Sequence, residues 1–203
     1  SGIDLTQFAS LGEAFGDTWR ENLFPFTAKY QAVFNKIENC SLPVVCVMHG
    51  YCLGMAFEMA LACDFRIAVE RTKIGLPESR LGIIPDVGGT VRLVKLIGPS
   101  RAKDIIMTGR NLDLTQAHEW GIINYVYSKA EIEDKVAEFV GELSASSPLA
   151  VSYTKRVIND IMDNSRGLQL EAWAQAQLFR TNDFMNAVEA MLDKTYPIDW
   201  EGK

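Results

Sequence analysis

The alternation of apolar and polar positions divides the first part of the chain into helices and strands. Apolar residues recur at helical spacing over residues 13–38, which predicts one or two helices interrupted by Pro25. The unbroken, Val-rich run at 42–50 predicts a strand buried on both faces, which is typical of parallel sheets under helices. The segment "DFRIAVE" at 64–70 predicts a second buried strand. Small apolar residues at 54–63 predict a buried helix between them. The order strand, helix, strand favours an α/β fold.

The pattern stays α/β for another stretch and then becomes purely helical. A short strand leading into a loop is predicted at 72–79, a turn cluster at 83–90, helices at 89–97 and 100–110 separated by Gly98-Pro99, and a strand at 122–127. Further helices are predicted at 131–144, 148–162, 167–180 and 182–194. We therefore expect an α/β core over residues 1–145 and a helical region over residues 146–203.

Composition and charge narrow the class of protein. The chain has 203 residues, 48% hydrophobic and 23% charged, as expected for one ordinary globular domain with a small appendage. A net charge of -6 without a basic stripe argues against a nucleic-acid partner. Every apolar run is too short to span a bilayer, so we expect no membrane association. The four cysteines form no C-x-x-C pair, which predicts reduced thiols and a cytoplasmic or organelle-matrix location.

An acid interrupts the apolar helix predicted at 54–63, within "HGYCLGMAFEMALACDF". A buried carboxylate costs several kcal/mol unless it is paired or its raised pKa is used in catalysis. Glu58 therefore either reaches solvent or pairs with Arg66, or it takes part in chemistry. A role in chemistry is favoured by Gly54 at the helix start, because glycine lets a ligand approach the free N–H of Met55. An oxyanion bound there would lie one turn from Glu58.

Two further acids lie in the loops that follow. Glu78 is set among apolar neighbours after Pro77, and Asp86 lies in the turn cluster. Glu78 is either a solvated loop residue or one half of an acid and base pair with Glu58, and Asp86 is most simply a turn residue or helix N-cap. His49 and His118 fit neither a nucleophile-elbow pattern nor metal-ligand spacing, so we expect no metal site.

Four segments in order make a family resemblance specific. "SGIDL", "PVVCVMHGYCLGMAFEMALACDFRIA", "IGLPESRLGIIPDVGGTVRLVKLIG" and "MTGRNLDLTQAHEWGIINYV" together resemble the enoyl-CoA hydratase/isomerase, or crotonase, family. The resemblance implies a crotonase-like spiral of ββα units with a helical C-terminal trimerisation region. It also implies that the chain assembles as a homotrimer or homohexamer. It also implies an acyl-CoA substrate, with coenzyme A as part of the substrate and no separate cofactor. A dinucleotide-binding site at Gly50 and Gly54 is a poorer interpretation, because the glycine spacing is wrong.

The resemblance assigns roles to individual residues. Glu58 and Glu78 match the two glutamates of the hydratases, which hold and activate water for addition at Cβ and deliver a proton to Cα. The backbone N–H groups of Ile3 and Met55 match the oxyanion hole. The remaining substrate or CoA contacts would be Ser1, Gly2, Leu5, Gly54, Pro77, Gly88, Gly89 and Lys194, with Gly88 and Gly89 at the acyl pocket wall and Lys194 reaching a neighbouring subunit's CoA.

Two departures from the family pattern keep alternatives open. Simple hydratases usually carry a small residue where this chain has Asp86, whereas some isomerases carry an acid, so a double-bond isomerase using Glu78 and Asp86 is the first alternative. Relatives also carry early strands and a helix before the segment that matches "SGIDL", so we expect the domain to be N-terminally incomplete. A non-catalytic acyl-CoA-binding family member is the further alternative.

Overall fold

Parallel strands form two small sheets at the centre of the chain. A computed structural model describes Gly2 and residues 23–162, 165–195, 198 and 200–201. Strands β1 (Val45–Met48), β3 (Phe65–Val69) and β5 (Tyr125–Tyr127) make one sheet in the order β1-β3-β5, and β2 (Tyr51–Leu53) pairs with β4 (Lys73–Gly75) in the other. All three strand pairings are parallel. Successive strands therefore alternate between the two sheets, and the predicted α/β fold is confirmed.

Left-handed turns make the chain pass from one sheet to the other. Gly50, with φ of 63°, separates β1 from β2, and Arg71, with φ of 67°, lies between β3 and β4. Strand β2 was not predicted, because the apolar run at 42–50 was interpreted as one strand ending in a glycine. Each pair of strands is followed by a helix: α4 (Met55–Leu61) after β2, and the 3-10 helix η2 (Pro77–Leu81) with α5 (Gly89–Thr108) after β4.

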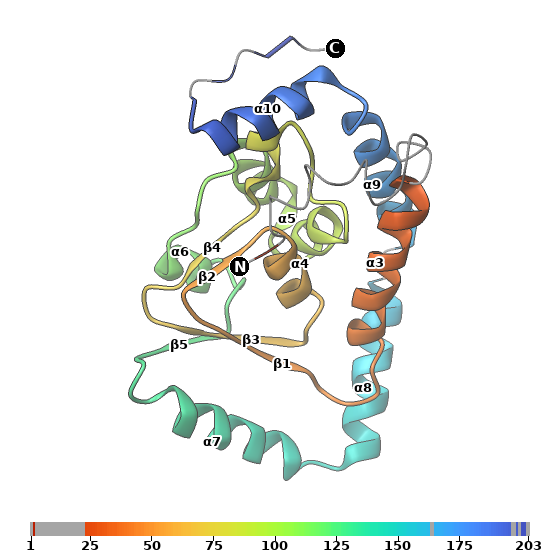
Figure 1. Cartoon of the computed structure of the whole chain (residues 1–203). Helices are drawn as coiled ribbons and strands as arrows, with labels where there is room; N and C mark the ends of the chain where they lie inside the picture. Colours follow the sequence, from red (N-terminus) through yellow and green to blue (C-terminus); the bar gives the residue numbers. More distant parts are fainter. Residues whose placement is uncertain (1, 3–22, 163–164, 196–197, 199, 202–203) are drawn as a thin grey trace.

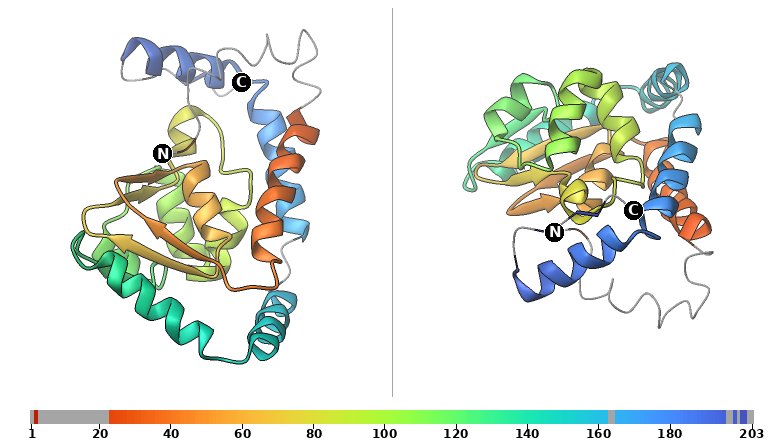
Figure 2. Two further views of the ribbon diagram at one scale, coloured as in Figure 1. Left: turned by 60° about the horizontal axis from the view of Figure 1, so that its bottom comes forward. Right: turned by 90° about the horizontal axis from the view of Figure 1, so that it is seen from above.

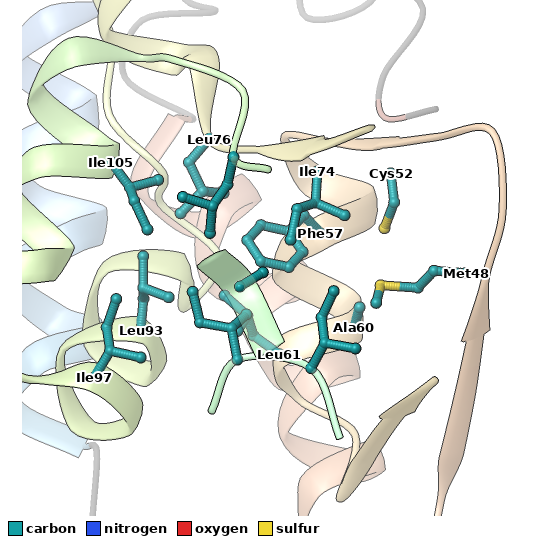
Figure 3. Packing of buried hydrophobic residues seen from close by; sticks show 14 of the residues in the cluster. Met48, Cys52, Phe57, Ala60, Leu61, Ile74, Leu76, Leu93, Ile97 and Ile105 are labelled. Atoms are coloured by element: carbon teal, nitrogen blue, oxygen red, sulfur yellow. The ribbon is translucent and has the colours of Figure 1, made fainter. Parts of the chain in front are cut away.

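The main core lies between the strands, α4 and α5. Phe57, Ile74, Leu76, Leu93 and Ile105 are completely buried and converge there (Figure 3). They come from α4, from β4 and the residue after it, and from α5. Burial of large apolar side chains in this way is the main favourable term in folding. The core therefore fixes α4 against α5, and with it the start of each helix.

The break predicted at Gly98-Pro99 is confirmed, because Gly98 has non-helical backbone angles and divides α5 into two helical segments. Gly98 has φ of 79° and ψ of 164°, and α5 continues on both sides of it. Helix α6 (Leu114–Glu119) was not predicted, although Asp113 is a standard N-cap whose carboxylate accepts hydrogen bonds from the N–H groups of Thr115 and Gln116. The helix is only six residues long, which leaves little periodicity to recognise.

The remaining helices surround this centre. Helix α3 (Leu23–Glu38) packs beside α9 (Ser165–Leu178), with α8 (Pro148–Ile161) continuing the same column, as Figures 1 and 2 show. Helix α7 (Ile132–Ser144) lies beyond the three-stranded sheet, and α10 (Asn182–Asp193) packs on η2. Between residues 148 and 193, the described residues contain helices and no strand. The division into a core and a helical region remains a prediction.

Candidate active site

A cavity of about 400 Å³ brings the three predicted acids together. Glu58 comes from α4, Glu78 from η2 and Asp86 from the loop before α5, and all three line the cavity. Its apolar wall is formed by residues from α3, η2, the following loop and the C-terminal helices: Phe26, Tyr30, Leu81, Ile83, Phe179 and Met191. A larger cavity of about 630 Å³ between α5 and α8 contains none of the three acids. The smaller cavity is therefore the candidate active site.

Glu58 is held by the turn that begins α5. Its side chain is buried, and Oε1 accepts hydrogen bonds from the N–H groups of Val87 at 3.1 Å and Gly89 at 2.9 Å. Pairing with Arg66 does not occur: the Arg66 guanidinium donates to the carbonyls of Ile122, Cys63 and Ala60. Main-chain donors fix the carboxyl group in place without neutralising it with a full positive charge, which keeps it available for proton transfer.

Glu78 lies in the first turn of η2, directly after Pro77. Its Oε2 is buried and has no hydrogen-bond partner among the described residues. A Cβ at Gly54 would lie 3.0 Å from Glu78 Oε1, and Gly54 has φ of 56°. Glycine at position 54 therefore lets the carboxyl group approach the start of α4, where the first N–H groups have no partner within the helix.

Asp86 faces the same cavity and is supported from α3. The hydroxyl group of Thr27 donates to Asp86 Oδ2 at 2.8 Å, and the Gln31 side-chain amide donates to the Asp86 carbonyl at 2.6 Å. No N-cap contact by Asp86 is observed: Gly88 is the N-cap of α5, and it makes no side-chain cap bond. Asp86 lies in a turn, as predicted, but the predicted N-cap role is wrong. Its side chain is half-buried in the cavity wall.

Burial raises the pKa values of all three acids, and neighbouring carboxylates add to this at Glu58 and Glu78. Burial is the largest factor that holds the pKa of Glu58 well above its usual range, and the charges of Glu78, Asp86 and Glu171 add to it. The hydrogen bond from the N–H of Gly89 acts in the opposite direction. Burial raises the pKa of Glu78 to about 7 and that of Asp86 to about 6. Groups that desolvate and repel one another in this way exchange protons near neutral pH, as acid and base pairs require.

Gly88 and Gly89 lie behind the cavity wall rather than on it. A Cβ at Gly89 would lie 2.5 Å from Glu58 Oε1, and one at Gly88 would overlap the Arg92 guanidinium. Gly88 also has φ of 104°, a region that glycine adopts readily. Both glycines therefore allow the turn to close on buried charged side chains. Their place in the acyl pocket wall stays a prediction.

The polar residues that support the site were missed in the sequence. Glu171 and Gln175 on α9, and Thr27 and Gln31 on α3, are all buried. Gln175 Oε1 accepts from the N–H of Ile84, and Glu171 accepts from two N–H groups at the start of α5. The spacing of Thr27, Gln31 and Asn35 at i, i+4 and i+8 was an available signal for a polar stripe on α3. The helix was predicted from its apolar positions alone, so this polar stripe was not recognised.

Other predicted contacts are only partly described. Ser1, Ile3 and Leu5 lie outside the described residues, whereas Gly2 lines the cavity beside Leu53. Met55 begins α4 at the cavity wall, and the first N–H groups of a helix have no partner within it. Its role as an oxyanion donor stays a prediction. Lys194 is the exposed left-handed C-cap of α10. Its contact with a neighbouring subunit's CoA stays a prediction.

The described part of the chain holds no metal-ligand cluster and no membrane-spanning helix. No group of three or more metal-ligating side chains occurs among these residues. Cys40, Cys46, Cys52 and Cys63 all carry free thiols. No helix of the described ranges is both long and apolar enough to cross a bilayer.

Comparison with known proteins points in one direction. The family model described as enoyl-CoA hydratase/isomerase matches residues 1–203. "Probable enoyl-CoA hydratase 2, mitochondrial" of Arabidopsis thaliana is 36% identical over 200 residues, which make up 98% of this chain and 64% of that protein. An enoyl-CoA isomerase/hydratase of Mycosarcoma maydis is 35% identical over 201 residues, covering 98% of this chain and 71% of its own length.

A solved structure shares the fold. The crystal structure of an enoyl-CoA hydratase from Mycobacterium avium subsp. paratuberculosis K-10 matches with a TM-score of 0.82 at 25% identity, over 88% of this chain and 74% of that chain. The predicted crotonase-like spiral is therefore confirmed as the fold. The chain spans less than two thirds of the length of the Arabidopsis relative, at 64%.

Proposed function

The chain belongs to the enoyl-CoA hydratase/isomerase family, and on that premise we propose that it adds water to trans-2-enoyl-CoA to give 3-hydroxyacyl-CoA. One observation carries the proposal: Glu58 and Glu78, the positions that match the two hydratase glutamates, line a single buried cavity. The raised pKa of both carboxyl groups supports it, since an acid and base pair needs carboxyl groups that exchange protons closer to neutral pH than free glutamate does.

Water addition follows from this pair. A water held between Glu58 and Glu78 loses a proton to the ionised carboxylate as its oxygen bonds to Cβ. The electron pair of the double bond moves toward the thioester, whose oxygen becomes an enolate that the N–H of Met55, and by family resemblance of Ile3, would stabilise. The protonated carboxyl group then delivers its proton to Cα. Coenzyme A is part of the substrate, and the proposed step needs no separate cofactor.

Substitution of Glu58 tests the reaction. Glu58→Gln retains the shape and an acceptor for Val87 and Gly89 but cannot exchange a proton, so hydration of crotonyl-CoA should fall by at least about 100-fold in kcat/KM. The control is Glu70→Gln, the same change at an exposed position at the end of β3. If the Glu58 variant hydrates crotonyl-CoA at the wild-type rate, measured by loss of the enoyl-thioester absorbance, the assignment is rejected. If the wild-type protein binds CoA but turns over no substrate, a non-catalytic family member is favoured.

Isomerisation is the second candidate because a third acid faces the same cavity. Asp86 lines the wall with its carboxyl group bonded to Thr27, and burial raises its pKa to about 6. A third proton donor beside the acyl chain could move a proton at a carbon beyond Cβ. The test compares wild type with Asp86→Asn on 3-enoyl-CoA and on trans-2-enoyl-CoA. Isomerase chemistry predicts that the variant loses only the first activity; equal retention of both activities excludes a role for Asp86.

Assembly is proposed from the exposed face of α8. Leu149, Tyr153, Val157 and Ile161 follow one another at intervals of four residues and are between 57% and 76% exposed. An apolar stripe of this kind favours burial against another subunit, which supports the homotrimer or homohexamer implied by the family. Light scattering after gel filtration should give three or six times the mass of the 22.6 kDa chain. A monomer at micromolar concentration contradicts the proposal.

Location and other partners complete the proposal. The four free thiols support a reducing compartment, and we propose the cytoplasm, although the Arabidopsis relative is named as mitochondrial. The net charge of -6 argues against a nucleic-acid partner. We propose a small acyl-CoA substrate and no membrane partner, since every apolar run is too short to span a bilayer. Fractionation of cells that express the tagged protein distinguishes the cytoplasm from an organelle matrix.

A further inference from the structure

A buried acid on α9 contacts the same turn that holds Glu58. Glu171 is 3% exposed, and its two carboxyl oxygens accept from the N–H of Gly88 and the N–H of Val91, each at 2.6 Å. Both donors belong to the first turn of α5, whose N–H groups have no partner within the helix. Glu171 therefore acts on α5 as a capping residue would, although it is 83 residues away from Gly88 in the sequence.

The N–H groups of this turn alternate between two carboxyl groups. Those of Val87 and Gly89 point to Glu58, whereas those of Gly88 and Val91 point to Glu171. The turn therefore lies between two acids that face it from opposite sides, one from α4 and one from α9. Since the backbone is continuous, a shift of the N–H groups that bond to Glu171 also shifts the N–H groups that bond to Glu58.

We propose that Glu171 is a positioning residue for the hydration site, which sets the place of the Glu58 carboxyl group through the turn at residues 87–91. The proposal rests on the proposed function only for its kinetic consequence, because the contacts exist whatever the substrate is. It makes α9 part of the active site although Glu171 does not line the cavity. Gln175, one turn further along α9, supports the preceding loop through the N–H of Ile84.

Charge gives Glu171 a second effect that a purely structural residue would lack. The charged groups that act on Glu58 are Glu78, Asp86 and Glu171, all of which raise its pKa. Arg92 lies beside Glu171 and favours its ionised form, whereas burial raises the pKa of Glu171 to about 8. Removing the acid should therefore lower the pKa of Glu58 as well as loosen its donors.

The test compares Glu171→Gln and Glu171→Asp with wild type. Glutamine retains the length but replaces one acceptor with a donor, and aspartate retains the charge but is one methylene group too short to reach both N–H groups. Either variant should lower kcat for crotonyl-CoA by about 100-fold with little change in KM, because reacting groups are displaced by a fraction of an ångström or more. The glutamine variant should also change the pH profile of kcat, because it removes a titrating carboxyl group that raises the pKa of Glu58, whereas the aspartate variant keeps one.

Amide hydrogen exchange provides a measurement that does not depend on turnover. Exchange at Val87 and Gly89 should become faster in both variants, although neither amide bonds to Glu171 itself. The control, Glu189→Gln, makes the same change on the exposed face of α10 and should alter neither rate nor exchange. Thermal melting shows which variants are folded at the assay temperature.

The outcomes separate this inference from the proposed function. A folded variant with wild-type kcat and wild-type exchange at Val87 and Gly89 overturns the positioning role while leaving hydration intact. A lower melting temperature with unchanged kcat, pH profile and exchange also overturns it, since Glu171 would then be merely structural. Absence of hydration in wild type overturns the proposed function, and the exchange rates still decide whether Glu171 places the turn.

Discussion

At the scale of single residues, Gly89 controls how closely Glu58 can approach α5. A Cβ added there would lie 2.5 Å from Glu58 Oε1 and 2.8 Å from its Cγ. The backbone at Gly89 has no positive φ, so alanine introduces a contact rather than backbone strain. We expect Gly89→Ala to displace the Glu58 carboxyl group and reduce crotonyl-CoA hydration by about 100-fold, with the protein still folded. Steady-state kinetics and circular dichroism measure the two effects.

The matched control is a glycine without such a neighbour. Gly141 lies inside α7, and a Cβ there would meet no atom within 4 Å. Gly141→Ala should leave hydration unchanged and stabilise the helix by about 0.5 to 1 kcal/mol, since glycine in a helix interior costs that much relative to alanine. Full activity in Gly89→Ala would show that Glu58 can move without consequence, which contradicts its assigned position.

The site residues differ in how much the sequence says about them. Glu58 and Glu78 interrupt apolar surroundings, and that conflict between charge and burial is visible without any structure. Glu171 lies in "LQLEAWAQAQLF", where polar residues occur throughout, so its burial is not apparent from the pattern. Its donors are 80 and 83 residues away, and only the packing of α9 against α5 brings them together.

At the scale of the elements, a buried ion pair joins α8 to the strands. Lys155 Nζ donates to Asp64 Oδ2 at 2.7 Å and to the Leu42 carbonyl at 3.1 Å, while the same Asp64 oxygen accepts from the N–H of Val44. The two side chains are 9% and 20% exposed. Lys155→Met keeps most of the volume but leaves Asp64 without its cation, so we expect a loss of about 2 kcal/mol in the free energy of unfolding, measured in urea.

A neighbouring pair on the same helix provides the comparison. Arg156 and Asp160 are separated by 3.9 Å, and both side chains are 76% exposed. Such pairs contribute about 0 to 1 kcal/mol because water screens the charges. Arg156→Met should therefore change the free energy of unfolding much less than Lys155→Met. Equal effects from the two variants would mean that helix propensity, rather than the contact with Asp64, determines the loss.

Long periodic elements were predicted better than short ones. The helices from α7 to α10 begin and end within two residues of the predicted limits, because their apolar faces repeat over three or more turns. Strand β2 has three residues and α6 has six, so neither carries a recognisable period. The partner of β2 is β4, more than twenty residues further along the chain. Pairing across that distance depends on the spiral as a whole and cannot be deduced from local pattern.

At the scale of the whole molecule, folding gathers acids that repel one another. Glu58, Glu78, Asp86 and Glu171 all have pKa values above those of the unfolded chain, where glutamate titrates near 4.5 and aspartate near 3.8. The folded state therefore binds more protons than the unfolded state between about pH 4.5 and 8. Carboxyl groups with lowered pKa values, such as Asp104 and Asp113, are exposed and titrate below this window.

The sign of the resulting pH dependence follows. Because the unfolded chain binds fewer protons in this window, the free energy of unfolding should fall as the pH rises from about 5 to 8. Each unit between the folded and unfolded pKa of a group corresponds to about 1.4 kcal/mol. Urea unfolding at several pH values measures the slope, which Glu78→Gln should reduce most between the unfolded pKa of 4.5 and the folded pKa of about 7. Stability that is constant or rises up to pH 8 would contradict the raised pKa values, and with them the shared proton on which water addition depends.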